Sequence, residues 1–252
     1  MLQIRYNHSS GFFSCCSLRL FQIVAYVNGT HSIPDSIIDA SDAFLLYKPS
    51  QVTDYFQDPS ASVIWSKPVR FDHNYQFGNY KFLDYKALGP LVQRYFSPSP
   101  DILRRVQILE QKYGLDESIC TLFYRGNDKV TETTLCSYEH IIMKGRSILQ
   151  QNPGIRFLIQ SDETEFIRRM ADEFPNSIVF QDECRHIPSS LTSVDLVMKE
   201  GNSEFSKWFL AITLVMSKSK FIVCTTGNCS LWIMLYRGHT KNIFQFLNSG
   251  WV

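Results

Sequence analysis

Several features that mark other classes of protein are missing from this sequence. Its 25 Lys and Arg residues are balanced by 24 Asp and Glu, and no basic face stands out, so we expect no nucleic acid as its main partner. The longest apolar run, residues 209–216, is too short to cross a bilayer, and the chain opens on a strand pattern rather than a signal peptide. These absences favour a soluble, cytoplasmic protein with no membrane span.

Two kinds of chemical site are also missing. The 7 cysteines are odd in number and include no C-x-x-C pair, which argues against a zinc site and against a disulfide framework. Several of them stand in apolar segments, where cysteine serves as a small hydrophobic residue. The sequence has no G-x-x-x-x-G-K-[ST] loop and no cluster of metal-binding carboxylates, so a kinase or a phosphatase is not favoured.

After residue 115 the sequence alternates regularly between strand and helix patterns. Apolar, partly β-branched segments predict the strands, and apolar residues at helical spacing predict the helices. The predicted strands are 119–124, 155–160, 177–180, 221–224 and 243–246. The predicted helices are 138–151, 164–174, 203–216 and 230–236. This spacing favours an α/β fold whose C-terminal half is a Rossmann-type parallel sheet covered by helices.

The first 114 residues are less regular. The pattern predicts a strand at 2–6, a turn at 7–11 and a helix at 12–27 that is closed by Gly29. A later helix is predicted at 97–113 and ends at Gly114. The aromatic-rich stretch between the two helices carries short predicted strands at 43–47 and 63–66. The sequence therefore divides into a smaller α/β lobe, residues 1–114, and a Rossmann-like lobe, residues 115–252.

The most informative segment is the loop after the strand 119–124, which carries Arg125, Asp128 and Lys129. In open α/β sheets, ligands bind outside the carboxyl ends of the strands. A fixed guanidinium there suits a phosphate, because it can donate two parallel hydrogen bonds. The loop therefore predicts a site for a phosphorylated small molecule, with a surface salt-bridge cluster as the alternative.

Three further polar loops precede predicted helices at the same expected sheet edge. Bare amides at helix N-termini attract anions, and a carboxylate such as that of Asp162 can accept hydrogen bonds from a base or a ribose. The candidate binding residues are Gly11, Phe12, Phe13 and Ser14 in the first loop, Ser161 and Asp162 in the second, and Thr225, Thr226, Asn228 and Ser230 in the third. Each loop alone could be an ordinary capped turn, but together the four favour one shared site.

These loops also carry a resemblance to a known family. The run FYRGNDK, residues 123–129, resembles the H-x-R-R-x-D-K motif of the α1,6-fucosyltransferases, the enzymes of core fucosylation and rhizobial nodulation factors. The runs SDE at 161–163 and CTTGNCS at 224–230 resemble that family's (S/T)-D-D and C-T-x-S-S segments, in the same order. GFFS at 11–14 is similar to the glycine-rich start of its first helix, and the resemblance covers residues 115–246 well and the N-terminal part thinly.

The resemblance implies a GT-B-like glycosyltransferase that moves fucose from GDP-fucose to a glycan acceptor, inverts the anomeric centre and needs no metal or other cofactor. By position, Arg125 matches the motif arginine that meets the pyrophosphate, and Asp128 and Lys129 match the aspartate and lysine that follow it. Asp162 matches the acidic residue near the nucleotide, and residues 226–230 match the second phosphate-binding loop.

The chemistry of glycosyl transfer is consistent with these residue types. Negative charge builds on the β-phosphate as the bond to the sugar breaks, and a preorganised cation binds that state more strongly than the ground state. We assign this role to Arg125, supported by Lys129. Glu132 is the predicted base for the acceptor hydroxyl, with Asp72 and Asp128 as alternatives, although Asp128 is rather expected to orient Arg125. No D-x-D pair that would hold a metal-bound nucleotide sugar is present.

The sequence departs from the family motif at two positions. Phe123 stands in place of the histidine, which helps to hold the nucleotide in that family, and Gly126 stands in place of the second arginine. Two alternatives stay open: a transferase that uses a different nucleotide sugar, and a non-catalytic nucleotide- or sugar-binding module derived from such an enzyme. The aromatic residues between 44 and 96 could stack on an acceptor sugar, which would make residues 1–114 the acceptor side, or simply pack the lobe.

Overall fold

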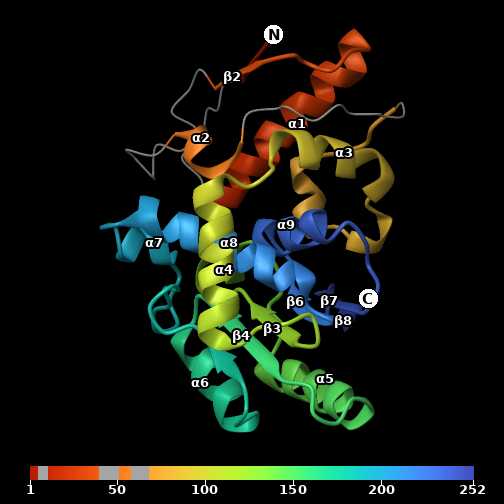
Figure 1. Ribbon diagram of the computed structural model, residues 1–252. Helices are drawn as coiled ribbons and strands as arrows, with labels where there is room; N and C mark the ends of the chain where they lie inside the picture. Colours follow the sequence, from red (N-terminus) through yellow and green to blue (C-terminus); the bar gives the residue numbers. More distant parts are fainter. Residues whose placement is uncertain (5–10, 40–50, 58–67) are drawn as a thin grey trace.

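The computed structural model describes residues 1–4, 11–39, 51–57 and 68–252, and its centre is a six-stranded sheet in the order β5-β4-β3-β6-β7-β8 (Figure 1). The strands are β3 (Cys120–Tyr124), β4 (Phe157–Ser161), β5 (Ile178–Val179), β6 (Phe221–Thr225), β7 (Ile243–Leu247) and β8 (Gly250–Trp251). Neighbouring strands pair in parallel, except that β8 returns antiparallel to β7. The predicted α/β class with a parallel sheet is therefore confirmed.

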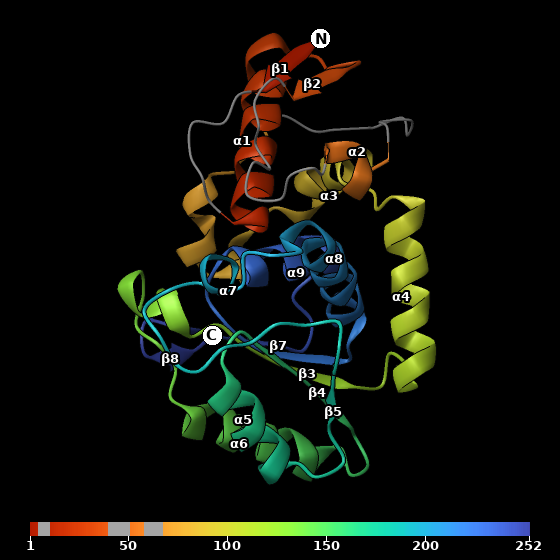
Figure 2. The same ribbon diagram turned by 90° about the vertical axis from the view of Figure 1, so that its left-hand side faces the viewer.

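Side chains of the central strand alternate between the two faces of the sheet, as the period of two of a strand requires. Cys120, Leu122 and Tyr124 pack in the cluster with α5 (Tyr138–Gln151) and α6 (Thr164–Glu173), whereas Phe123 belongs to the cluster on the opposite face. Figure 2 shows α5 and α6 on one side of the sheet, with α8 (Asn202–Lys218) and α9 (Asn228–Arg237) on the other. Because both faces are covered, the strands are continuous apolar runs in the sequence.

The N-terminal part begins with a parallel pair of short strands and continues mainly in helices. Its elements are β1 (Leu2–Ile4), α1 (Phe12–Thr30), β2 (Ile37–Asp39), α2 (Val52–Tyr55), the 3₁₀ segments η2 (His73–Phe77) and η3 (Tyr80–Phe82), α3 (Tyr85–Tyr95) and α4 (Pro100–Tyr113). The predicted strands at 43–47 and 63–66, and the predicted turn 7–11 apart from its last residue, lie outside the described residues. Across the described ranges, no helix is both long and apolar enough to cross a membrane.

The sequence does not predict helix α3, because its centre carries a Gly-Pro pair with Pro90 in the second position. The helix forms nevertheless: Asp84 caps it by accepting a hydrogen bond from the N–H of Ala87 at 3.0 Å. One face then buries Leu88, Leu91 and neighbouring apolar residues. Burial of this face outweighs the local cost of a proline inside a helix.

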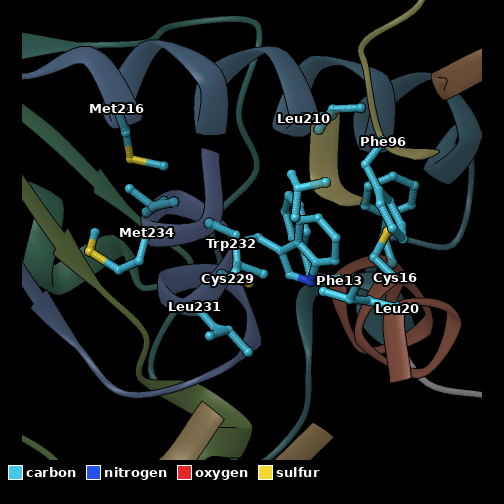
Figure 3. Packing of buried hydrophobic residues seen from close by; sticks show 14 of the residues in the cluster. Phe13, Cys16, Leu20, Phe96, Leu210, Met216, Cys229, Leu231, Trp232 and Met234 are labelled. Atoms are coloured by element: carbon cyan, nitrogen blue, oxygen red, sulfur yellow. The ribbon is translucent and has the colours of Figure 1, made fainter. Parts of the chain in front are cut away.

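A single buried cluster joins the two parts of the chain. At its centre, Trp232 of α9 is fully buried and packs against Phe13 of α1 and against Phe96 (Figure 3). The indole Nε1 donates to Oγ of Ser17 at 3.0 Å, and that hydroxyl donates to Oδ1 of Asn228 at 2.7 Å. These contacts hold the start of α1 against the start of α9.

The predicted division after residue 114 falls at the end of α4, where Gly114 takes the left-handed capping conformation with φ of 56°. The shared core crosses this point, since it includes residues of α1, α3, α8 and α9. A division into an acceptor lobe and a nucleotide lobe stays a prediction.

Candidate active site

One cavity of about 720 Å³ gathers most of the predicted site residues. Its walls come from the loops after β3 and β4, the start of α1, the segment η2, residues 183–185 and 193–196, the helix α8 and the start of α9. The predicted residues that line it are Gly11, Phe12, Phe13, Ser14, Arg125, Asp128, Lys129, Glu132, Ser161, Asp162 and Asn228. Loops that are far apart in the sequence therefore meet at one hollow, of a size that suits a small molecule.

Arg125 is fixed at the wall of this cavity, at the end of β3. Its side chain is 17% exposed, its Nε lies 3.0 Å from Oδ2 of Asp162, and its Nη2 donates to Oδ1 of Asp128 at 3.1 Å. Burial acts to lower the pKa of the guanidinium, but the nearby carboxylates, above all Asp162, raise this pKa above its ordinary value. Arg125 is therefore a permanent, oriented cation.

Asp162 also joins the loop after β4 to the loop after β3. Its Oδ1 accepts from the N–H of Gly126 at 3.0 Å, and its carbonyl oxygen accepts from Nδ2 of Asn127 at 2.7 Å. Asn127 adopts a left-handed backbone conformation with φ of 45°, and its Oδ1 accepts from the N–H of Ser190 at 3.0 Å. The loop that carries Arg125 is thus held in place on two sides.

Steric contacts explain why a glycine stands at position 126, where the resembled motif has its second arginine. A Cβ atom at Gly126 would lie 2.5 Å from Oε2 of Glu163 and 2.9 Å from the Tyr124 ring. Glu163 is buried, and its Oε2 accepts a hydrogen bond from the hydroxyl of Tyr138 at 2.6 Å. Because this carboxylate is held on its other side, no larger residue fits at position 126 without displacing it.

Lys129 and Glu132 belong to the turn that begins with the 3₁₀ segment η4 (Asn127–Thr131). Their side chains form an ion pair of 2.6 Å, with 12% of the lysine and 36% of the glutamate exposed. Glu132 is thus the more open group and lies at the cavity. The alternative base, Asp72, does not line the cavity; it caps η2 by accepting from the N–H of Asn74 at 2.8 Å.

Thr225, Thr226 and Ser230 do not line the cavity. The hydroxyl oxygen of Thr225 accepts from the backbone N–H of Arg125 at 3.1 Å, and the hydroxyl of Ser230 donates to the carbonyl of Thr225. The N–H of Gly227 donates to the backbone of η2. Thr225 therefore supports the backbone that carries Arg125, and a role of Thr225, Thr226 and Ser230 in binding a phosphate stays a prediction.

Sequence reasoning misses one wall of the cavity, formed by residues 183–185, residues 193–196 and the start of α8. Here the guanidinium of Arg185 lies 3.6 Å from the centre of the Phe205 ring, and its Nη1 donates to Oδ1 of Asn202 at 2.8 Å. Burial lowers the pKa of Arg185 from its ordinary value. The local sequence shows only a polar loop, so no local signal identifies this wall.

The positive charge at the cavity comes from side chains, namely Arg125, Lys129 and Arg185. Within the part of the chain that the structure describes, no group of three or more His, Cys, Asp and Glu side chains could hold a metal ion.

No family model matches this chain, and no curated protein matches it. Among solved structures, the fucosyltransferase NodZ from Bradyrhizobium aligns at a TM-score of 0.43 and 14% identity, over 64% of this chain and 49% of that one. POFUT1 in complex with GDP-fucose gives 0.41 and 10%, over 64% and 50%. A mutant of FUT1 from Arabidopsis thaliana, in complex with GDP, gives 0.38 and 10%, over 66% and 37%.

These three structures are of fucosyltransferases, the class whose motifs this chain resembles. The chain spans about half the length of the NodZ and POFUT1 chains that it matches. At these TM-scores the likeness assigns no function to this chain.

The close contacts of Gly126 lead to a first prediction. The substitution Gly126→Ala should lower the free energy of unfolding by about 1–3 kcal/mol, because the added methyl group overlaps the carboxylate of Glu163. Denaturant unfolding monitored by circular dichroism measures this change. The matched control is Gly29→Ala, at an exposed helical position with no atom within 4 Å of the new Cβ. This control should raise the stability by about 0.5–1 kcal/mol, and equal effects of the two substitutions would contradict the steric account.

Proposed function

We propose that this chain is an inverting glycosyltransferase that moves a sugar, fucose from GDP-fucose, to a hydroxyl group of a glycan. The observation that carries the proposal is the oriented guanidinium of Arg125 at the wall of a cavity of about 720 Å³, with Lys129 on the same loop. Such a cavity has the volume of a typical small-molecule site, and its fixed cation suits a diphosphate. The choice of fucose and GDP is supported by the motif resemblance.

In the proposed reaction, the bond between C1 of the sugar and the β-phosphate oxygen breaks, and its electron pair stays on the phosphate. Arg125 and Lys129 offset the charge that builds there, and their effect is largest in the transition state. The acceptor hydroxyl attacks C1 from the opposite face of the sugar, which inverts the anomeric centre. Glu132, the partly exposed carboxylate at the cavity, takes the proton of that hydroxyl.

One feature favours a second candidate, a nucleotide-binding module without turnover. Arg125 is paired with Asp162 and Asp128, and Lys129 is paired with Glu132. A diphosphate must compete with these carboxylates for the cations, and Glu132 must leave Lys129 to act as a base. The two candidates differ in a measurable way, because a binding module would retain GDP but would neither hydrolyse nor transfer the sugar of GDP-fucose.

The proposed mechanism predicts how the arginine responds to a conservative change. Arg125→Lys should lower turnover of GDP-fucose by roughly 10²-fold, because an ammonium group cannot reproduce the planar fork of the guanidinium. Turnover is measured as release of GDP in the presence of a glycan acceptor. Arg169→Lys, at a surface ion pair with Glu139, is the matched control and should leave turnover unchanged. Near-normal turnover in Arg125→Lys would contradict the mechanism.

A second variant tests the role of Glu132 as the base independently of the role of Arg125 as the cation. Glu132→Gln should lower transfer to the acceptor by roughly 10²–10⁴-fold and leave the affinity for GDP within a few-fold of the wild type. Unchanged transfer in Glu132→Gln would remove the base assignment and leave the role of Arg125 standing.

The same mechanism predicts that turnover needs no divalent metal, because side-chain cations supply the charge at the leaving group. Addition of EDTA should therefore leave the rate of GDP release unchanged. Loss of activity on chelation, with recovery on addition of Mn²⁺ or Mg²⁺, would contradict this prediction.

A further inference from the structure

Gln160 is a polar residue at a position where the fold calls for an apolar one. It lies on β4 directly opposite Phe123 of β3, and it is only 3% exposed. Two residues earlier on the same strand, Leu158 is fully buried in the core cluster that also contains Phe123. Because side chains alternate along a strand, Gln160 faces the same side of the sheet as Leu158.

The side-chain oxygen of Gln160 is buried and lacks a hydrogen-bond partner among the described residues, although the residue lines the cavity. A buried polar atom without a partner typically costs about 1–3 kcal/mol of folding free energy. Such atoms are uncommon in folded proteins and call for a specific explanation. Rotation of the terminal amide toward the cavity would let a group that enters from outside supply the missing partner.

The chemistry of this atom restricts what the partner can be. The oxygen of this amide only accepts hydrogen bonds, whereas its NH2 group donates them, so a phosphate oxygen would satisfy the NH2 group but not the oxygen. The amide oxygen needs a hydroxyl or N–H donor. We expect the phosphates at Arg125, which follows the end of β3, the strand that pairs with the strand of Gln160. The hydrogen-bond donor for Gln160 therefore belongs to a part of the ligand next to the phosphates.

The transferred sugar and the nucleoside of such a ligand differ in how exposed to solvent they have to be. The transferred sugar has to meet an incoming acceptor, and Glu132, with 36% of its side chain exposed, marks the open side of the cavity. Gln160 lies instead at a buried position on the sheet. We propose that Gln160 is a binding residue that accepts a hydrogen bond from a hydroxyl or N–H group of the nucleoside, and this inference rests on the proposed function.

The test uses Gln160→Met, which retains the length of the side chain and removes the amide. Affinities for GDP, UDP, ADP and inorganic pyrophosphate are measured by calorimetry, and the melting temperature is measured without ligand. We expect GDP to bind about tenfold more weakly to the variant, while pyrophosphate binds as it does to the wild type. The melting temperature should stay the same or rise, because an unsatisfied polar group has been removed.

Gln245→Met provides the matched control. Gln245 is equally buried, but its Oε1 accepts from the N–H of Tyr80 at 2.9 Å and its Nε2 donates to the carbonyl of Gly78 at 2.8 Å. This control should lower the melting temperature and leave GDP affinity within about twofold. If Gln160→Met behaves in the same way, Gln160 is a structural residue and the inference fails.

The remaining outcomes separate this inference from the proposed function. If the wild type prefers UDP or ADP, and that nucleotide is weakened tenfold by Gln160→Met, the inference stands and the GDP assignment fails. If GDP binds the wild type and Gln160→Met alike, or if pyrophosphate is weakened as much as GDP, the inference fails and the proposed function stands. If the wild type binds no nucleotide, both fail.

Discussion

The ion pair between Arg125 and Asp162 is the constraint on which the rest of the site depends. The two residues follow neighbouring strands, β3 and β4, so their contact fixes the ends of these strands relative to each other. Both side chains are largely buried, and removal of Arg125 would leave the carboxylate of Asp162 without its cation; breaking a buried pair in this way typically costs about 3–5 kcal/mol. Asp162 also holds the backbone of Gly126. One carboxylate therefore orients the cation and shapes the loop that carries it.

The part of the cavity wall formed by the start of α1 depends on a different kind of contact. Phe12 and Phe13 line the cavity and are buried in the core, where Phe13 packs on Trp232. The hydrogen bonds from Trp232 to Ser17 and from Ser17 to Asn228 hold α1 against α9. The N-terminal part thus contributes directly to the cavity, and a Rossmann-like half alone would leave it incomplete.

Local pattern was sufficient to predict the five parallel strands, because each is a largely buried apolar run and each intervening helix has apolar residues at helical spacing, but it did not predict β8, a two-residue antiparallel return. The same rule located Arg125, Asp128 and Asp162, since ligand-binding loops follow strand ends. Helix α3 escaped prediction because its Gly-Pro pair opposes a helix locally, while burial of one face against the core favours it. Arg185 and Gln160 could not be assigned a role, because only tertiary packing brings the first to the cavity and leaves the second without a partner.

The most direct test of the account is a comparison of GDP and guanosine as ligands of the wild-type protein by isothermal titration calorimetry. If Arg125 binds a diphosphate through charge-assisted hydrogen bonds, GDP should bind at least about 100-fold more tightly than guanosine. This ratio should shrink sharply in Arg125→Lys, because the fork that binds the phosphates is lost. Equal affinities of GDP and guanosine for the wild type would contradict the claim that the cavity is built around a cation for a diphosphate.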